Sequence, residues 1–457
     1  MSDQLLGAND GGLVVAELPS AGELEALVER TLREAARLGA EAAEAAVSFG
    51  QGLSVSVRMG EVETLEHHRS RSLAVTVYSG GRQGSASTSA WDQSALAETV
   101  AAAVEIARHT QEDPCAGLAD PDRLAREIPD LELDWPWPLS PQSAIELARR
   151  CEAAALAGSP EVRNSEGAGV GSVRSLACYG TSHGFRGAWS GTRHSLSCGV
   201  VAERGGAMQR GHWASIARQA AALEGAEAVG ERAGRRAVAR LGARRLTTAR
   251  VPVLFAPEVA RSLLGHLVGA VSGGALYRGA SFLRDRLGQR LFPTWVRIHE
   301  QPHLPRALGS APFDGEGVAT RARDLVAAGE LRGYVLDSYS ARRLGMQTTG
   351  NAGGVHNLEI EPNAGDQAAL IRQLGRGLVV TQLMGQGVNL VTGDYSRGAG
   401  GFWVEDGELA YPVDEITIAG RLQDLFAGLA AAGNDLDARG SIRCGSLLVE
   451  QMMVAGD

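Results

Sequence analysis

The sequence predicts an α+β protein with largely antiparallel sheets. A two-part N-terminal region of helices and strand meanders precedes a β-rich, glycine-rich C-terminal domain. Two observations support this fold class. Segments with apolar residues at helical spacing flank long stretches in which apolar and polar residues alternate, and this scheme occurs twice in succession. Strands and helices do not alternate singly, as they would in a parallel sheet built from βαβ units.

The first part of the N-terminal region contains a helix, a meander and a second helix. Residues 22–42 carry apolar side chains at helical spacing, with acidic residues early and arginines late, which indicates a helix. Residues 45–89 alternate apolar and polar side chains between glycine turns, as an antiparallel meander does. Residues 92–110 return to helical spacing, and Asp92 or Ser94 can cap that helix.

The scheme recurs after residues 121–142, which are rich in proline and acidic residues and predict a linker. Beyond this linker we expect a helix, a second meander and a further helix, over residues 143–158, 172–220 and 223–241. The glycine-rich remainder predicts mostly strands, with helices near residues 258–271, 318–329 and 420–432. The expected divisions are an N-terminal α+β subdomain, a central α+β subdomain and a C-terminal β-rich domain, over residues 22–115, 116–245 and 246–457.

Composition excludes several classes of function. The chain is 44% hydrophobic and 21% charged, and no apolar run reaches the roughly 18–20 residues that a membrane span needs. A net charge of −9 argues against a nucleic-acid-binding surface. All 44 basic residues are arginine. The chain therefore has neither the lysine of a nucleotide-binding P-loop nor a lysine for a Schiff base.

Cysteine usage and the N-terminus indicate a cytoplasmic protein. The five cysteines form no CxxC pair and no even framework, which is typical of reduced thiols. The first residues, MSDQLLGANDGG, lack the basic segment and apolar stretch of a signal peptide.

One stretch contains a zinc-enzyme string. Residues 298–303, IHEQPH, include His299, Glu300 and His303 in the pattern His-Glu-x-x-His. In zinc enzymes the two histidines lie on one helix face and bind one metal. Pro302 disfavours a helix here, and the preceding residues suit a strand. We therefore expect a strand that runs into a turn, with no zinc at this string.

Two glycine-rich stretches are candidates for ligand binding. Residues 348–357, TTGNAGGVHN, and 387–403, GVNLVTGDYSRGAGGFW, concentrate small and polar residues in turns of the β-rich region. Such turns let a backbone approach an extended peptide closely and pair with it; they are equally compatible with tight turns in a compact sheet. The candidate substrate-binding residues are Asn351, His356, Asp394, Tyr395 and Arg397.

These stretches, together with GEVETLEHHRSRSLAVTVYSGG, PHLPRALGSAPFDGEGVAT and GNDLDARGSIRCGSLLV, resemble the TldD/PmbA family, once labelled modulators of DNA gyrase. The resemblance spans residues 24–455 and is to the PmbA branch, also called TldE. It implies a cytoplasmic TldD/TldE pair that encloses a peptide-sized cavity and acts in peptide maturation and proteolysis. In that pair the TldD member holds zinc through a His-Glu-x-x-x-His helix and a cysteine.

On the helix that matches this pattern, Gly265, His266 and Ala270 stand at the positions of the first histidine, the glutamate and the second histidine. Cys444 stands where the family's cysteine ligand would be. One thiol and one displaced histidine cannot hold zinc tightly. The resemblance therefore implies no metal in this chain and no catalytic residue, with His266 and Cys444 as the remaining cavity candidates.

The resulting expectation is a zinc-less subunit that shapes the substrate cavity beside a TldD-like, zinc-bearing partner, for a peptide or unfolded polypeptide. One alternative is a stand-alone homodimer that binds peptides, since a homodimer is possible for the isolated chain. A second is recruitment to amide hydrolysis in a natural-product pathway. A third is an independent enzyme with Cys444 as nucleophile, assisted by His266 or His356. Action on gyrase or DNA is disfavoured by the acidic charge.

Overall fold

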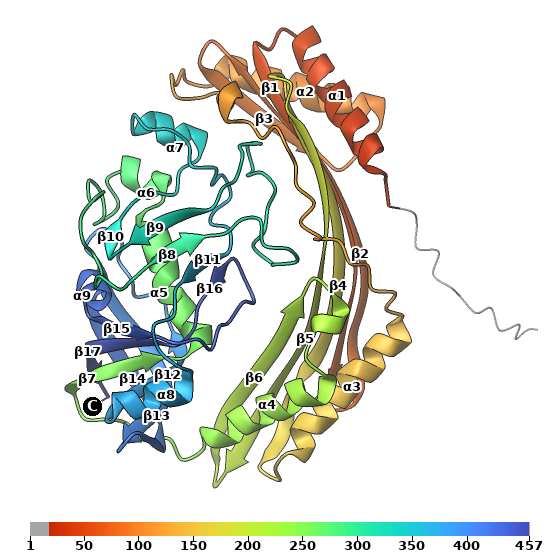
Figure 1. Cartoon of the computed structure of the whole chain (residues 1–457). Coiled ribbons are helices and arrows are strands. Elements are labelled where there is room, and N and C mark those ends of the chain that lie inside the picture. The colour runs from red at the N-terminus through yellow and green to blue at the C-terminus, as the bar shows by residue number, and fades with distance from the viewer. Residues whose placement is uncertain (1–17, 457) are drawn as a thin grey trace, which may run out of the picture.

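The computed structural model describes residues 18–456, which form a long curved N-terminal sheet and a C-terminal domain on its concave side (Figure 1). The predicted lack of a signal peptide falls on residues 1–17, outside this range. The N-terminal sheet has the strand order β3-β2-β1-β4-β5-β6, and every neighbouring pair is antiparallel. Its strands are β1 Ala42–Arg58, β2 Glu61–Ser79, β3 Arg82–Thr88, β4 Val162–Thr181, β5 Arg186–Arg204 and β6 Ala207–Ala217.

The alternation predicted for the meanders gives this sheet one apolar face. In register, Val47 of β1 lies opposite Leu73 of β2 and Cys178 of β4, and all three side chains are buried. Four helices cover this convex face and complete two apolar clusters, one near each end of the sheet. They are α1 Ala21–Arg37, α2 Gln93–His109, α3 Pro141–Ala157 and α4 Ala226–Ala239.

Local sequence signals place these helices. Ser20 and Glu23 form a capping box at the start of α1, and Asp92 caps α2 through the backbone N–H groups of Ser94 and Ala95. Helices α3 and α4 pack closely because Gly230 has no side chain. A Cβ there would lie 1.9 Å from the carbonyl oxygen of Cys151, so no other residue fits without moving the helices apart.

The C-terminal domain contains two sheets that share one core with helix α5. Their strand orders are β14-β13-β12-β7-β17-β15 and β10-β9-β8-β11-β16. The core joins Phe255 of β7, Leu264 of α5 and Ile298 of β8, all fully buried. The strands are β7 Ala249–Phe255, β8 Ile298–Glu300, β9 Arg323–Ala327, β10 Glu330–Leu331, β11 Leu358–Ile360, β12 Gly377–Met384, β13 Asp394–Glu405, β14 Glu408–Arg421, β15 Leu429–Ala432, β16 Ile442–Arg443 and β17 Leu447–Ala455. The helices are α5 Pro257–Ala270, α6 Gly273–Tyr277, α7 Ser338–Arg343, α8 Gln367–Leu374 and α9 Leu422–Ala427.

Two segments predicted as helices in this domain differ in the structure. The helix expected over residues 318–329 is wrong: β9 and β10 form a hairpin there, because Ala328 and Gly329 adopt the positive φ angles of a tight turn. The helix expected over residues 420–432 ends at Ala427, and the alanine-rich remainder forms β15, which pairs with β17. Pairing with an existing sheet outweighs the helical propensity of alanine. The α+β class with mostly antiparallel sheets is confirmed.

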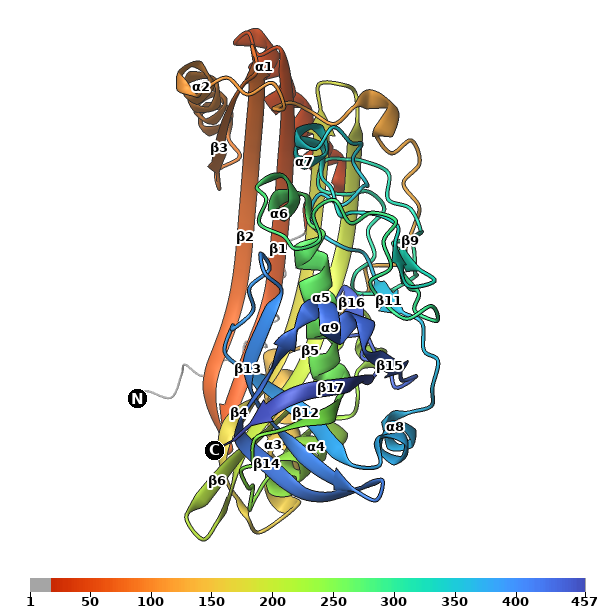
Figure 2. The ribbon, with the colours of Figure 1, turned by 90° about the vertical axis from the view of Figure 1, so that its left-hand side faces the viewer.

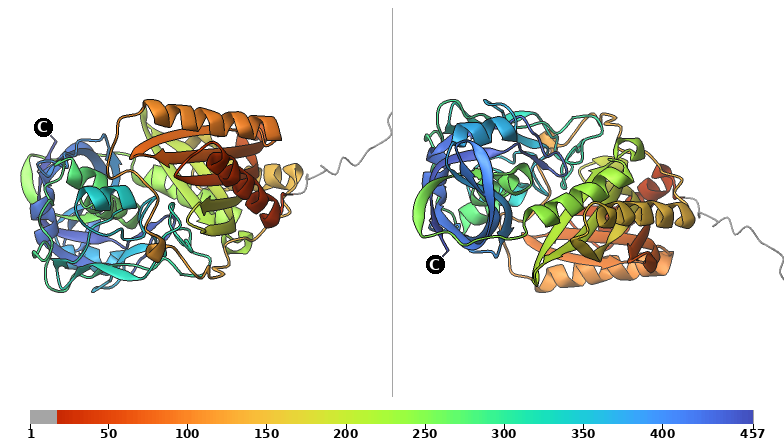
Figure 3. Two further views of the ribbon diagram at one scale, coloured as in Figure 1. Left: turned by 90° about the horizontal axis from the view of Figure 1, so that it is seen from above. Right: turned by 90° about the horizontal axis from the view of Figure 1, so that it is seen from below.

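Hydrogen bonds attach the C-terminal domain to both ends of the N-terminal sheet. At one end the Arg342 guanidinium of α7 donates to the carbonyl oxygens of Cys115 and Gly117. At the other end Arg240, which follows α4, forms an ion pair of 3.2 Å with Asp414 of β14. Seen along the sheet in Figure 3, this domain stands on one side and α1 on the other. None of the helices between residues 18 and 456 combines the length and hydrophobicity that a membrane crossing requires.

Candidate functional site

The candidate site is built around α5, which the sequence starts with Pro257 at its first turn and buries through its apolar face. Gly265 faces β16, where a Cβ would meet the Ile442 side chain at 3.8 Å. Ala270 is fully buried in the core. Neither residue carries a donor atom, so two of the three positions that the resemblance assigns to metal chemistry cannot contribute a ligand.

His266 projects from α5 toward β13. Its ring packs edge-on against the Tyr395 ring, with the ring centroids 5.9 Å apart. Burial and, to a lesser extent, the nearby positive charge of Arg397 together lower the pKa of His266 to about 4. The imidazole is therefore neutral at neutral pH. Its buried Nε2 atom has no hydrogen-bond partner within the described part of the chain.

Tyr395 and Arg397 complete the group around His266. The Tyr395 side chain is 1% exposed, and its hydroxyl has no hydrogen-bond partner among residues 18–456. Burial raises the pKa of Tyr395 to about 12, although the adjacent Arg397 opposes the shift. Arg397 donates from Nε to the Gly385 carbonyl oxygen at 3.1 Å and makes no ion pair within the same residues. We call His266, Tyr395 and Arg397 the polar recess.

Buried polar atoms in folded proteins are nearly always hydrogen-bonded, so the polar recess requires an explanation. Of these three residues, Arg397 is half-buried and has no carboxylate partner, so its guanidinium can donate to an acceptor from outside the chain, whereas the His266 Nε2 atom and the Tyr395 hydroxyl are shielded from solvent. A carboxylate or a backbone carbonyl of a bound peptide has the matching chemistry. The recess thus brings together three of the predicted residues from two elements.

Cys444 lies two residues beyond Ile442 but does not join the polar recess. The side chain is fully buried, and its thiol donates to the Gly445 carbonyl oxygen at 3.1 Å. Burial raises its pKa well above the ordinary range, and the carboxylates of Asp435 and Asp437 raise it further. The thiol is protonated, and neither His266 nor His356 hydrogen-bonds to it in the described structure. This geometry does not activate Cys444 as a nucleophile.

The same residues fail a test for zinc. Gly265 and Ala270 offer no donor, Cys444 offers a protonated thiol, and His266 alone offers one imidazole nitrogen, whereas a catalytic zinc site needs three protein ligands. Across residues 18–456 no group of three histidine, cysteine or carboxylate side chains is arranged to hold a metal.

The loop 348–357 is held by Glu300, from the string that mimics a zinc motif. Glu300 is 2% exposed and forms an ion pair of 2.6 Å with Arg323 of β9. Its other carboxylate oxygen accepts hydrogen bonds from the Asn351 side chain and the His356 backbone N–H, both at 2.9 Å. Glu300 is the last residue of β8, so the end of this strand holds the loop in place through these hydrogen bonds.

The histidines of that string have separate environments. The chain forms a short strand up to Glu300 and then a turn, as predicted. His299 is buried and its Nε2 lies 2.6 Å from the Gln301 side-chain amide, whereas His303 Nε2 lies 2.9 Å from the Thr320 hydroxyl. The two imidazoles therefore satisfy different partners.

Within the loop, Asn351 and His356 differ in what they can offer a ligand. Asn351 is fully used by the protein: its amide donates to Glu300 and to the Gly354 carbonyl oxygen, and its oxygen accepts from Arg323. Asn351 therefore shapes the loop rather than presenting free donors. The buried Nε2 of His356 has no partner within residues 18–456.

Nearby, burial raises the pKa of the Asp314 carboxyl group, and His356 opposes that shift.

Asp394 lies apart from the polar recess. It begins β13, is exposed, and faces Arg421 at 3.7 Å, a pair with both side chains largely in solvent. The stretch predicted as turns is a turn only up to Gly393, because β13 begins at Asp394 and pairs with β14, and from Gly398 onward it also pairs with β12. Strand alternation then puts Tyr395 and Arg397 on one side and Asp394 on the other.

Sequence reasoning missed Glu300 and Arg323 as the residues that fix the loop. They are 23 positions apart and lie on neighbouring strands, so their pairing depends on the sheet. The one available signal was a glutamate within an apolar strand pattern, since a buried carboxylate requires a partner.

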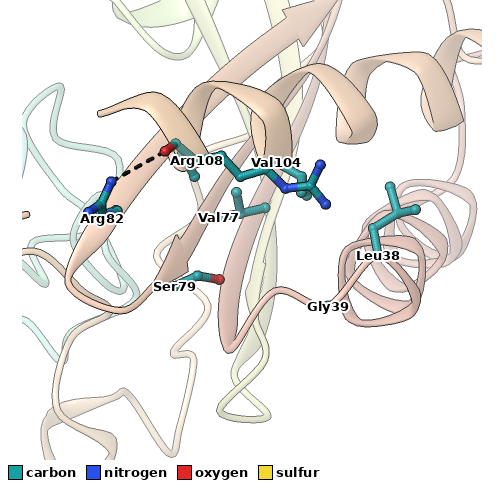
Figure 4. Close-up of a pocket in the computed structure, with 8 residues that line it drawn as sticks. Leu38, Gly39, Val77, Ser79, Arg82, Val104 and Arg108 are labelled. Carbon is teal, nitrogen blue, oxygen red and sulfur yellow. Dashed lines mark hydrogen bonds between the residues drawn. The ribbon is translucent and has the colours of Figure 1, made fainter. Parts of the chain in front are cut away.

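A separate cavity of about 310 Å³ lies at the far end of the N-terminal sheet, between α1, α2 and the hairpin of β2 and β3 (Figure 4). It is lined by Leu38, Val77 and Val104, with Arg82 and Arg108 at its rim. The Arg82 guanidinium there donates to the Arg108 carbonyl oxygen at 3.3 Å. None of the predicted site residues lines it.

Three family profiles match the chain in succession. They describe PmbA/TldA metallopeptidase domain 1, over residues 43–107, the central domain, over 134–241, and the C-terminal domain, over 248–456. Together they cover most of the chain.

Named relatives and solved structures agree with these profiles. The chain is 48% identical to the metalloprotease PmbA of Escherichia coli O157:H7 over 426 residues, which are 93% of this chain and 95% of that protein. It is 45% identical to the metalloprotease PmbA homolog of Haemophilus influenzae, over 95% of this chain and 96% of that one. The crystal structure of a putative modulator of DNA gyrase from Bacteroides thetaiotaomicron superposes with a TM-score of 0.91 at 28% identity, covering 95% of this chain and 99% of that chain. The fold is also similar to TldE from Thermococcus kodakarensis, with a TM-score of 0.84 at 21% identity, over 94% of this chain and all of that one.

Proposed function

Because this chain belongs to the PmbA/TldD metallopeptidase family, we propose that it is the zinc-free subunit of a heterodimeric peptidase. Its partner would be a TldD-like chain that carries the His-Glu-x-x-x-His helix and the zinc. The substrate would be a peptide or an unfolded polypeptide in the cytoplasm. In keeping with that location, all five cysteines are free.

The observation that carries this proposal is the chemistry of α5 and Cys444. The fold of a metallopeptidase family is complete, yet Gly265 and Ala270 have no donor atoms and the Cys444 thiol is buried and protonated. A chain that keeps the family's fold while lacking the metal ligands is suited to shape a cavity for a partner's metal. It is poorly suited to cleave peptides alone.

The role proposed for this subunit is to grip an extended peptide. The polar recess offers the half-buried Arg397 guanidinium, which suits a carboxylate or a carbonyl oxygen. Glu300 holds the loop 348–357 in place. Gly353 of this loop is exposed and has open space beside it, so a peptide backbone can approach it closely. We propose that residues 348–356 and 392–401 line the peptide path.

The test compares this chain purified alone with the chain co-expressed with a TldD-like partner. Zinc content is measured by elemental analysis and cleavage with an unstructured peptide. We expect the lone chain to be metal-free and inactive, and the pair to hold about one zinc and to cleave. Stoichiometric zinc in the lone chain, or cleavage by it, would overturn the proposal.

Two variants of this chain sharpen the test in the complex. Arg397→Ala should raise KM more than it lowers kcat, because Arg397 binds substrate and takes no part in the chemistry. Cys444→Ala is the matched control: it should leave zinc content and kcat of the complex unchanged, since this thiol contacts neither metal nor substrate. A loss of zinc in Cys444→Ala would contradict the assignment.

A stand-alone peptide-binding protein is the second candidate, and the unpartnered atoms of the polar recess favour it. It predicts that the lone chain binds unstructured peptides with an affinity that Arg397→Ala reduces, and that adding a TldD-like chain produces no cleavage. Amide hydrolysis in a natural-product pathway would instead appear as cleavage of small conjugates, but not of peptides, by the pair.

A further inference from the structure

The concave face of β5 carries two large, exposed side chains. Strand alternation puts Gly187, Trp189 and Arg193 on this face, and the last two are exposed. The ring of Phe313, from the C-terminal domain, lies directly over Gly187, where a Cβ would meet it at 2.6 Å. Figure 2 views the sheet from this side, with the C-terminal domain in front of β4 and β5. Trp189 and Arg193 therefore stand on the side of the sheet that is turned toward the C-terminal domain.

Trp189 is the only exposed aromatic side chain between residues 18 and 456, with 38% of its surface accessible. Its neighbours across the sheet are small. Ala177 of β4 lies opposite it, and Ser48 of β1 and Ser72 of β2 continue the row. None of these side chains is large enough to cover the indole. An apolar side chain from outside the chain that packed on the indole would remove the apolar surface of both groups from water.

Arg193 lies beside a second guanidinium. Strand β6 ends at Ala217, which pairs with His194 of β5, so the next residue, Arg218, comes to lie next to Arg193 on the same face. Arg218 donates to two backbone carbonyl oxygens of the C-terminal domain, at 3.0 and 3.1 Å. Burial and the positive charge of Arg193 lower the pKa of Arg218.

This pair of like charges has no counter-ion in the described chain. Within residues 18–456 neither Arg193 nor Arg218 forms an ion pair with a carboxylate. The donors of Arg218 are used by carbonyl oxygens, whereas the exposed Arg193 guanidinium has no hydrogen-bond partner among these residues. Two neighbouring guanidinium groups repel each other, and a carboxylate from outside the chain would offset that repulsion. The planar guanidinium of Arg193 also suits the two oxygens of a carboxylate.

We propose that Trp189 and Arg193 form a subsite for a peptide that carries an acidic and an apolar side chain. Arg193, with Arg218 beside it, binds the carboxylate, and Trp189 packs against the apolar group. Residues four positions apart on a strand are about 13 Å apart, so a peptide extended along β5 would match with side chains that are also four positions apart. The inference rests on the proposed function, which supplies a peptide as the ligand, and it names the class of peptide. It uses no residue of the polar recess.

The experiment measures the binding of fluorescein-labelled peptides to the full chain by fluorescence anisotropy. The probe is an unstructured glycine- and serine-rich peptide with one phenylalanine and, four positions further on, one aspartate. Two matched peptides replace the aspartate by asparagine or the phenylalanine by alanine. The wild type should bind the probe roughly tenfold more tightly than the asparagine peptide, because a hydrogen bond between charged groups contributes more than a neutral one. It should bind the probe roughly threefold or more tightly than the alanine peptide.

Three variants assign the preference to the subsite. Arg193→Gln should bind the probe roughly tenfold more weakly and the asparagine peptide as the wild type does. Trp189→Ala should weaken the binding of only those peptides that contain phenylalanine. Arg33→Gln is the matched control, since it removes the charge of an exposed arginine on α1, on the other side of the sheet, and should change no affinity. Circular dichroism verifies that the variants are folded.

Several results would overturn the proposal. They are equal affinities for the three peptides, no binding of any of them by the wild type, and an aspartate preference that survives in Arg193→Gln. An equal loss in Arg33→Gln would also overturn it, because the preference would then come from overall charge. Zinc in the lone chain, or cleavage by it, would refute the proposed function instead, and is a separate readout from the ratio of the peptide affinities.

Discussion

Replacing Glu300 tests whether the loop 348–357 is held as the structure indicates. Glu300→Ala removes a buried ion pair with Arg323, whose side chain is 13% exposed, and two hydrogen bonds from Asn351 and His356. Breaking a buried pair by removing one partner costs about 3–5 kcal/mol, mainly because the remaining charge is left uncompensated. We expect the free energy of unfolding to fall by that amount.

Urea denaturation gives the loss of stability, and hydrogen exchange over residues 348–357 shows where it acts. Glu415→Ala is the matched control, because its ion pair with Arg245 has both side chains more than 60% exposed. Such exposed pairs contribute little to stability because solvent screens the two charges. Glu300→Gln keeps the shape and an acceptor oxygen, so we expect a loss of roughly half that of Glu300→Ala.

If Glu300→Ala costs no more than Glu415→Ala, or if exchange in residues 348–357 does not accelerate, Glu300 does not hold the loop. In the proposed heterodimer, loosening the loop should also raise KM, because residues 348–356 are proposed to line the peptide path.

Three further predictions concern groups with shifted pKa values. Folding lowers the pKa of His266 from 6.5 to about 4, so the unfolded chain binds a proton more readily between these values. The free energy of unfolding should therefore fall as the pH drops from 6.5 toward 4. His266→Gln should flatten that part of the pH–stability curve. Burial raises the pKa of Glu316 from 4.5 to about 7. The contribution of this carboxyl group to folding stability is therefore complete below about pH 4.5 and is lost as the pH rises through 7. Glu316→Gln should raise the Tm at pH 8 and change it little at pH 4.5. Iodoacetamide should label the partly exposed Cys115 of the folded chain and leave Cys444 unmodified until urea is added, as mass spectrometry of the peptides would show; rapid native labelling of Cys444 would contradict its burial.

Local sequence signals predicted much of the fold because they act over a few residues. Asp92 caps its helix through its immediate neighbours, and Pro302 keeps the zinc-like string out of a helix. The alternation in residues 45–89 places side chains on two faces of a strand wherever that strand lies. The helix predicted near residues 318–329 is wrong and the one predicted near 420–432 is too long, because β9 pairs with β8 and β15 pairs with β17.

The candidate site, too, could be predicted from the sequence only in part. Tyr395 and Arg397 were predicted as substrate-binding residues in a turn, whereas the structure places them on one face of strand β13. Their closeness to His266 could not be predicted, since it depends on how α5 packs over β13. Asn351 was predicted to bind substrate, but the structure uses all its hydrogen bonds to hold the loop.

The sequence by itself determined that the positions Gly265 and Ala270 cannot bind a metal, because a side chain without a donor atom has none in any fold. It also determined the class of fold, through patterns of period two and 3.6. Only the tertiary structure decided that Glu300 and Arg323 form a buried pair, that Cys444 is a protonated thiol, and that Arg193 and Arg218 lie side by side. Burial, charge proximity and strand pairing depend on residues far apart in the chain, and a single sequence does not specify which of them meet.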